Sequence, residues 1–145
     1  MDQAALQALA GRSLPGGHFS IDADENRRLC GILGSAPATD GTAHPLYAYI
    51  ATQRAMGVTV DGLFEICGFS MDDGPMLAST SLDLQGPLWI GTTYTVESRI
   101  AGIERKTGRK LGAFDLLSVE LDLLDGAERV AGATNVFVLP RGPEA

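Results

Sequence analysis

The second half of the chain alternates between apolar and polar residues, which is typical of antiparallel strands with one buried face and one solvated face. The first run sets an apolar face against a polar one: Ala78, Thr80, Leu82 and Leu84 against Ser79, Ser81, Asp83 and Gln85. The pattern recurs over residues 93–100, 111–123 and 129–139. A turn at Thr107-Gly108 and a hairpin signal at Asp125-Gly126 separate these runs. We therefore expect four consecutive strands.

The first half of the chain predicts a short strand followed by a capped helix. Residues 18–21 alternate like a strand. Asp22, with Glu25 three residues later, is close to a capping box and indicates that a helix begins there. This helix is expected to run to about residue 34, with an apolar side made of Leu29, Ile32 and Leu33.

Two further helices are expected after a loop of small residues at 35–43. Pro45 suits the first turn of a helix over residues 45–56. A helix over residues 59–70 carries apolar residues at i, i+3, i+4 and i+7, which are Val60, Leu63, Phe64 and Cys67. An apolar helix and a large antiparallel sheet bury each other's apolar faces, so the pattern predicts an α+β domain with this helix at its centre.

Composition narrows the class of protein. The chain has 145 residues, of which 45% are hydrophobic, so we expect one domain over residues 1–145. A net charge of −7 argues against a nucleic-acid partner. Neither a membrane span nor a signal peptide is indicated. Cys30 and Cys67 lack metal-ligand spacing and are expected to be free thiols of a cytoplasmic protein that needs no metal or other cofactor.

The segment His44-Pro45-Leu46-Tyr47, followed by an Ala-rich run, resembles the signature of MaoC-like (R)-specific enoyl-thioester hydratases and dehydratases, Asp-x-Asn-Pro-Leu-His before a helix. A second block, residues 82–91, is similar to that family's next strand pair, with Pro87 and Gly91 at matching positions. Residues 11–15 resemble the opening of such domains. The resemblance covers most of the chain and implies a hotdog fold, an antiparallel sheet wrapped around a central helix.

The resemblance also implies a hydro-lyase reaction on an acyl thioester, carried by coenzyme A or by an acyl-carrier protein. The family's catalytic Asp and His fall on Thr42 and Tyr47 here. Asp40 and His44 lie on the same loop, two and three residues before those positions, and are predicted to form a shifted acid/base pair, with Tyr47 as a donor. The alternative is that Asp40 forms a turn with Gly41 and that His44 is a surface residue.

The substrate is expected to contact Thr42 and the backbone N–H of Gly62, which corresponds to the family's glycine at a helix entry and would polarise the thioester carbonyl. The alternative role for Gly62 is close packing of the helix on the sheet.

Three functions remain open. The first is a MaoC-like hydratase or dehydratase. The second is a non-catalytic hotdog subunit that shapes the acyl tunnel of a heterodimer. The third and least favoured is a hotdog thioesterase using Asp61 or Glu65, which are otherwise solvated or at a dimer interface. An open edge strand predicts a homodimer or a heterodimer with a second hotdog chain.

Overall fold

The computed structural model describes residues 1–142, and residues 143–145 lie outside the described part. Its elements are, in order, α1 (Gln3–Gln7), β1 (Ser13–Ser20), α2 (Ala23–Ile32), α3 (Tyr47–Arg54), α4 (Val60–Ile66), the 3-10 helix η1 (Met71–Asp73), β2 (Met76–Leu84), β3 (Thr93–Gly108), β4 (Gly112–Asp125) and β5 (Glu128–Gly142). The five strands form one antiparallel sheet in the order β1-β3-β4-β5-β2. The α+β prediction is confirmed.

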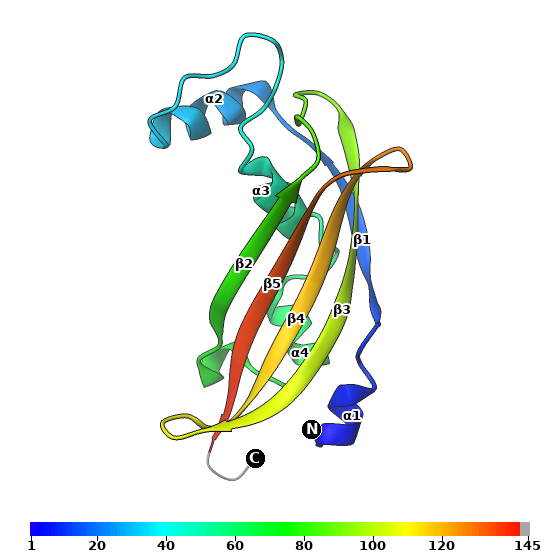
Figure 1. The fold of residues 1–145 in the computed structure, drawn as a ribbon, viewed down its shortest axis with the longest axis vertical. Helices are drawn as coiled ribbons and strands as arrows, with labels where there is room; N and C mark the ends of the chain where they lie inside the picture. Colours follow the sequence, from blue (N-terminus) through cyan, green and yellow to red (C-terminus); the bar gives the residue numbers. More distant parts are fainter. Residues whose placement is uncertain (143–145) are drawn as a thin grey trace.

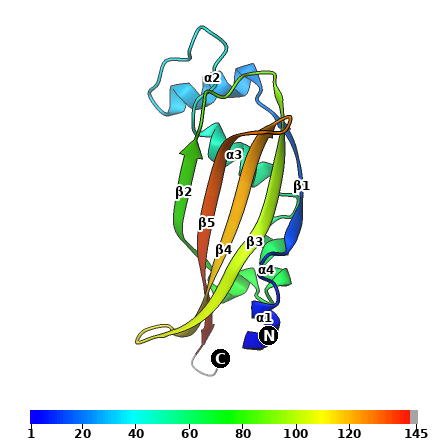
Figure 2. The same ribbon diagram turned by 45° about the vertical axis from the view of Figure 1, so that its right-hand side comes forward.

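The sheet curves around α3 and α4, whereas α2 lies beyond one end of it (Figures 1 and 2). The helix that contacts all five strands is α3, not the predicted helix over residues 59–70. That second helix ends at Ile66, and it buries Leu63, Phe64 and Cys67 as expected while leaving Val60 exposed. Within residues 1–142, no helix is long and apolar enough to cross a bilayer.

Helix α2 begins as predicted but buries a different side. The Asp22 carboxylate accepts the Glu25 N–H at 2.9 Å, which caps the helix. The expected apolar side is wrong, because Ile32 is 82% exposed and the buried residues are Asn26 and Cys30. The reason is the position of α2: it packs on the segment that leads into α3 instead of on the sheet.

The edge strand β2 also departs from its prediction. All nine of its residues are exposed, although their alternation predicted one buried face. Leu82 and Leu84 pair with Ala133 and Ala131, which are buried, so these leucines point to the helix-covered side of the sheet. Although α3 contacts β2, these leucines remain 39% and 41% exposed, and the strand has a neighbour, β5, on one side alone.

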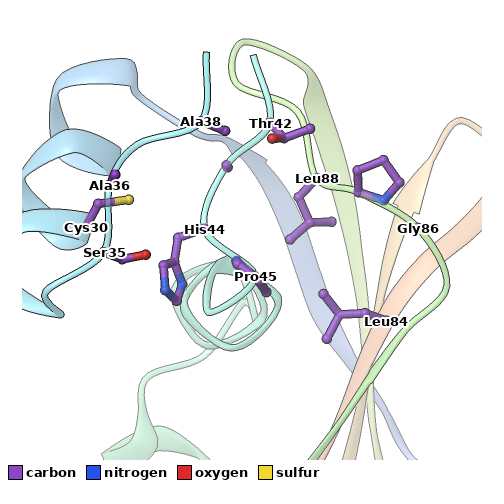
Figure 3. A pocket seen from close by; sticks show the side chains of 12 residues that line it. Cys30, Ser35, Ala36, Ala38, Thr42, His44, Pro45, Leu84, Gly86 and Leu88 are labelled. Carbon is purple, nitrogen blue, oxygen red and sulfur yellow. The ribbon is translucent and has the colours of Figure 1, made fainter. Parts of the chain in front are cut away.

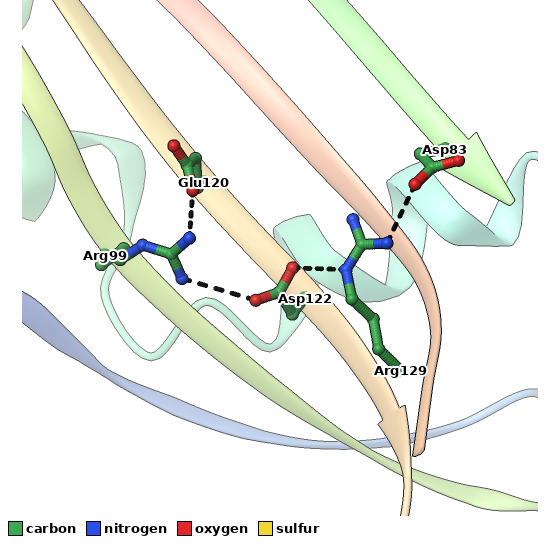
Figure 4. A network of polar contacts seen from close by, with 5 residues as sticks. All are labelled: Asp83, Arg99, Glu120, Asp122 and Arg129. Carbon is green, nitrogen blue, oxygen red and sulfur yellow. Dashed lines mark hydrogen bonds and ion pairs between the residues drawn. The ribbon is translucent and has the colours of Figure 1, made fainter. Parts of the chain in front are cut away.

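A row of ion pairs crosses the outer face of the sheet and reaches this edge strand (Figure 4). Arg99 on β3 pairs with Glu120 and Asp122 on β4. Arg129 on β5 pairs with the same Asp122 and with Asp83 on β2, each at 2.9 Å. These exposed pairs connect four strands, so they hold the edge strand's side chains in a defined arrangement more than they add stability.

A buried carboxylate ties the opposite end of the sheet to α4. Asp115 on β4 is fully buried and accepts hydrogen bonds from Arg105 at 2.8 Å and Arg141 at 2.7 Å. Arg141 also donates to the carbonyl oxygens of Cys67 and Gly68, each at 2.7 Å, where α4 ends. Burial raises the pKa of Asp115, but the bonds from both arginines outweigh it and hold the pKa below its usual 3.8.

Replacing Asp115 with Asn should destabilise the fold by about 3–5 kcal/mol at pH 7, because two arginines would lose their buried counter-charge. Since the folded-state pKa is depressed, the carboxylate's contribution is present above about pH 4 and is lost as the pH falls through the folded-state value. Urea unfolding of both proteins at pH 7 and pH 3 should therefore show a smaller gap at pH 3. Asp83→Asn, in an exposed pair, is the control and should cost less than about 1 kcal/mol.

Candidate functional site

A cavity of about 330 Å³ lies between α2, the loop that precedes α3, and the segment that follows β2 (Figure 3). Its walls are mostly small or apolar, and they comprise Cys30, Ser35, Ala36, Ala38, Thr42, Ala43, His44, Pro45, Leu84, Gly86, Pro87 and Leu88. The cavity therefore sits at the end of the free edge strand. Its size is at the lower end of the range for small-molecule sites in proteins.

His44 belongs to the cavity wall, where Figure 3 shows its imidazole between Ser35 and Pro45. The backbone N–H of His44 donates to Asn26 Oδ1 at 2.9 Å, and the N–H of Leu46 donates to His44 Nδ1 at 3.0 Å. A ring nitrogen that accepts a hydrogen bond carries no proton, so the neutral imidazole carries its proton on Nε2. The buried Asn26 on α2 thus positions the backbone of the histidine.

Asp40 is not among the residues that line this cavity. Its Oδ1 accepts from the Thr42 hydroxyl at 2.6 Å and from the Thr42 N–H at 3.0 Å, and the side chain is exposed. These two bonds lower the pKa of Asp40. The loop forms the Asx turn through Gly41 that was given as the alternative: the Asp40 carboxylate accepts from the N–H two residues on, that of Thr42, and makes no hydrogen bond to His44.

Tyr47, at the position of the family's histidine, is fully buried and donates its hydroxyl to Glu25 Oε1 at 2.9 Å. Burial, together with the bond to Glu25, raises the pKa of Tyr47 to about 12. Arg54 pairs with the same carboxylate at 2.8 Å, and this bond lowers the pKa of Glu25. All three residues border a separate cavity of about 180 Å³ between α2 and α3.

Sequence reasoning assigned Glu25 to the helix cap alone and missed this pair. Glu25 and Tyr47 are 22 residues apart, and no local pattern connects them. The one hint in the sequence is the tyrosine itself, which stands where a catalytic histidine was expected and needs a hydrogen-bond partner when buried. In the structure, the Glu25 carboxylate accepts hydrogen bonds from both Tyr47 and Arg54.

Gly62 lies in the first turn of α4 and does not line the cavity beside His44. Its N–H donates to Thr59 Oγ1 at 3.0 Å, which is an N-cap bond. Asp61 and Glu65 are exposed and border a different cavity, about 290 Å³, near η1. The structure therefore brings Thr42 and His44 together at one cavity and places Asp40, Tyr47 and Gly62 elsewhere.

Within residues 1–142, no group of three or more His, Cys, Asp or Glu side chains is arranged to bind a metal ion. Cys30 and Cys67 are both free and buried.

No protein-family model matches the sequence, and no curated protein matches it significantly. Solved structures do match. A MaoC-like dehydratase from Rhodospirillum rubrum is 18% identical, with a TM-score of 0.64, over 92% of this chain and 94% of that one. The ChsH1-ChsH2 complex of Mycobacterium tuberculosis is 12% identical, with a TM-score of 0.68, over 98% and 90%. The HadBC (3R-hydroxyacyl-ACP dehydratase) complex from the same organism is 13% identical, with a TM-score of 0.66, over 90% and 96%.

At these identities the likeness concerns the fold. The curved antiparallel sheet around a helix superimposes on MaoC-like dehydratase structures over at least 90% of the chain, so the chain has the hotdog fold that its sequence motifs predicted.

Proposed function

We propose that the chain is a hotdog subunit that binds an acyl thioester, of coenzyme A or acyl-carrier protein, in the cavity beside His44. A second hotdog chain would supply the acid/base groups for hydration or dehydration. The proposal depends on one observation: the expected catalytic groups are hydrogen-bonded to other residues of the chain. The Asp40 carboxylate accepts from Thr42, and the Tyr47 hydroxyl donates to Glu25. An acid/base pair for this chemistry must lie within hydrogen-bond reach of the substrate.

The exposed edge strand β2 favours a role for a second chain. It has a paired neighbour, β5, on one side alone, and Leu82 and Leu84 are exposed on the face of the sheet that carries the helices. Long, apolar edge strands without a cover are sites of strand addition. Two of the similar structures, ChsH1-ChsH2 and HadBC, are complexes of two named components. The cavity lies at the end of this strand, so a partner paired there would adjoin it.

A self-sufficient hydratase is the second candidate. Thr42 and His44 line the same cavity, and this favours a role for that loop in chemistry. For catalysis within one chain, Asp40 would have to leave Thr42 and turn toward His44. A thioesterase using Asp61 or Glu65 is less supported, because both carboxylates lie at a different cavity and are exposed.

Pairing through β2 should fail when a charge replaces one of its exposed leucines. Leu82→Lys should reduce the mass measured by light scattering from that of a pair of hotdog chains to that of one chain, 15.2 kDa. Leu111→Lys is a matched control, because both leucines are 39% exposed and Leu111 lies at the far hairpin. If the unaltered chain is a monomer at micromolar concentration, both alone and with co-expressed hotdog chains, the pairing is refuted.

Filling the cavity should abolish thioester binding. Gly86 lines the cavity, and a Cβ added there meets no atom within 4 Å, so Gly86→Leu should fold and take up cavity space. Calorimetry should show at least a tenfold weaker affinity for crotonyl-coenzyme A. Gly31→Leu, on the exposed side of α2 with equal free space, is the control and should bind as the unaltered chain does. Equal affinities for both variants would place the binding site elsewhere.

The unaltered chain by itself should not hydrate crotonyl-coenzyme A, and Asp40→Asn should leave thioester binding unchanged, because Asp40 does not reach the cavity. A shifted acid/base pair requires the opposite result. The chain would then be active alone, and Asp40→Asn and His44→Ala would each lower the hydration rate by roughly 100-fold or more. A steady-state absorbance assay of the enoyl thioester separates the two outcomes.

A further inference from the structure

The hydrogen bonds around His44 define the polarity of the cavity wall. Leu46 N–H points at Nδ1 at 3.0 Å, and the His44 backbone is held by Asn26, whose side chain is 1% exposed. The ring therefore has its one neutral-state proton on Nε2, and Nε2 makes no hydrogen bond within residues 1–142. A fixed N–H donor in a mostly apolar cavity calls for an acceptor from the ligand.

Most of the other side-chain donors at this cavity are already engaged. The Thr42 hydroxyl donates to Asp40, and the Cys30 thiol is directed at Asn26 Oδ1, at 3.9 Å. Ser35 is the remaining hydroxyl, and it lies on an exposed loop. His44 is thus the side-chain donor best placed to meet a ligand oxygen.

We propose that His44 Nε2–H binds the carbonyl oxygen of the thioester, in the role for which the sequence had suggested the Gly62 amide. This assignment rests on the proposed function. The Gly62 N–H is bonded to Thr59 and lies outside the cavity, so it does not serve this purpose. A donor aimed at the carbonyl oxygen polarises the thioester and stabilises the negative charge that develops on that oxygen when the α-carbon gains or loses a proton.

This role is the reverse of a general base. A base at Nε2 needs a lone pair there, and the neutral ring would then carry its proton on Nδ1. That proton would face the Leu46 N–H, so two donors would oppose each other. In the assigned arrangement, His44 holds and polarises the carbonyl and the proton transfers belong to the partner's groups.

Two substitutions distinguish a donor from a base. Glutamine places an amide N–H close to the position of Nε2 but does not act as a base, whereas alanine removes both functions. The probe is crotonyl-coenzyme A labelled with a heavy isotope at its carbonyl carbon, followed by infrared difference spectroscopy and calorimetry. We expect the carbonyl band to shift to lower frequency on binding to the unaltered protein, because a hydrogen bond weakens the C=O bond.

His44→Gln should keep this shift and bind within about threefold of the unaltered protein. His44→Ala should lose the shift and bind about tenfold more weakly, which is the usual worth of one neutral hydrogen bond. His18→Ala removes the other imidazole of the chain, which lies on β1 beside Thr95 and not at the cavity; it is the control and should keep both the shift and the affinity, while Ser35→Ala tests the one other unengaged hydroxyl. Thermal unfolding of each variant checks that the fold is intact.

The outcomes separate this assignment from the proposed function. If the unaltered protein does not bind the probe, the proposed function fails and this assignment fails with it. If the probe binds but His44→Ala keeps the band shift, or His44→Gln loses it, the donor role of His44 is overturned while thioester binding stands. Loss of the shift in Ser35→Ala alone would transfer the role to Ser35.

Discussion

An eight-residue helix, α3, lies in the hollow of a five-stranded sheet and contacts every strand. Its buried side includes Ala48 and Ala51, whose small side chains let the helix backbone approach the sheet closely. Tyr47 fills the remaining width at the start of the helix. The sheet buries its concave face against this helix and the short α4 that follows. The position of α3 therefore determines which parts of that face are buried. The loop before α3 forms the cavity wall because of that placement.

Coverage ends before the sheet does. Strand β2 pairs with β5 on one side alone, and all nine of its residues stay exposed although α3 contacts the strand. Hydrophobic surface of this kind, at an open edge, is costly in a lone chain and favours association. The row of ion pairs from Arg99 to Asp83 holds the outer face of the same edge in register. The cavity beside His44 opens at the end of this strand, which joins the ligand site and the pairing edge in one region.

The second determinant of the site is one buried amide. Asn26 Oδ1 accepts the His44 N–H and lies opposite the Cys30 thiol, so α2 and the entrance of α3 share an acceptor. A buried polar group of this kind requires its partners, and it restricts the loop to a conformation that supplies them. That conformation turns the histidine's Nδ1 toward Leu46. The backbone of the loop therefore determines which nitrogen of His44 is the hydrogen-bond donor at the cavity wall.

Local patterns determined a large part of the fold. Period-two alternation located β3 and β4, where Tyr94, Val96 and Leu121 are buried as expected, and Asp22 marked the start of α2. These features depend on contacts between near neighbours in the chain, which a sequence displays directly. The motif around Pro45 and Leu46 indicated the hotdog fold because it encodes the entrance of the helix that the sheet surrounds.

Tertiary structure decided the rest. Alternation within β2 does not reveal how much of the strand its neighbours cover, and the apolar residues Ile32 and Leu82 are 82% and 39% exposed. Asp115 gains its arginines, and Tyr47 its glutamate, from segments 10 to 26 residues away. Asp40 and His44 have the right chemistry and spacing for a catalytic pair, yet hydrogen bonds within the loop direct one to Thr42 and the other to Leu46. Sequence spacing supplies candidate groups, but the orientation of each side chain follows from the partners that the folded chain provides.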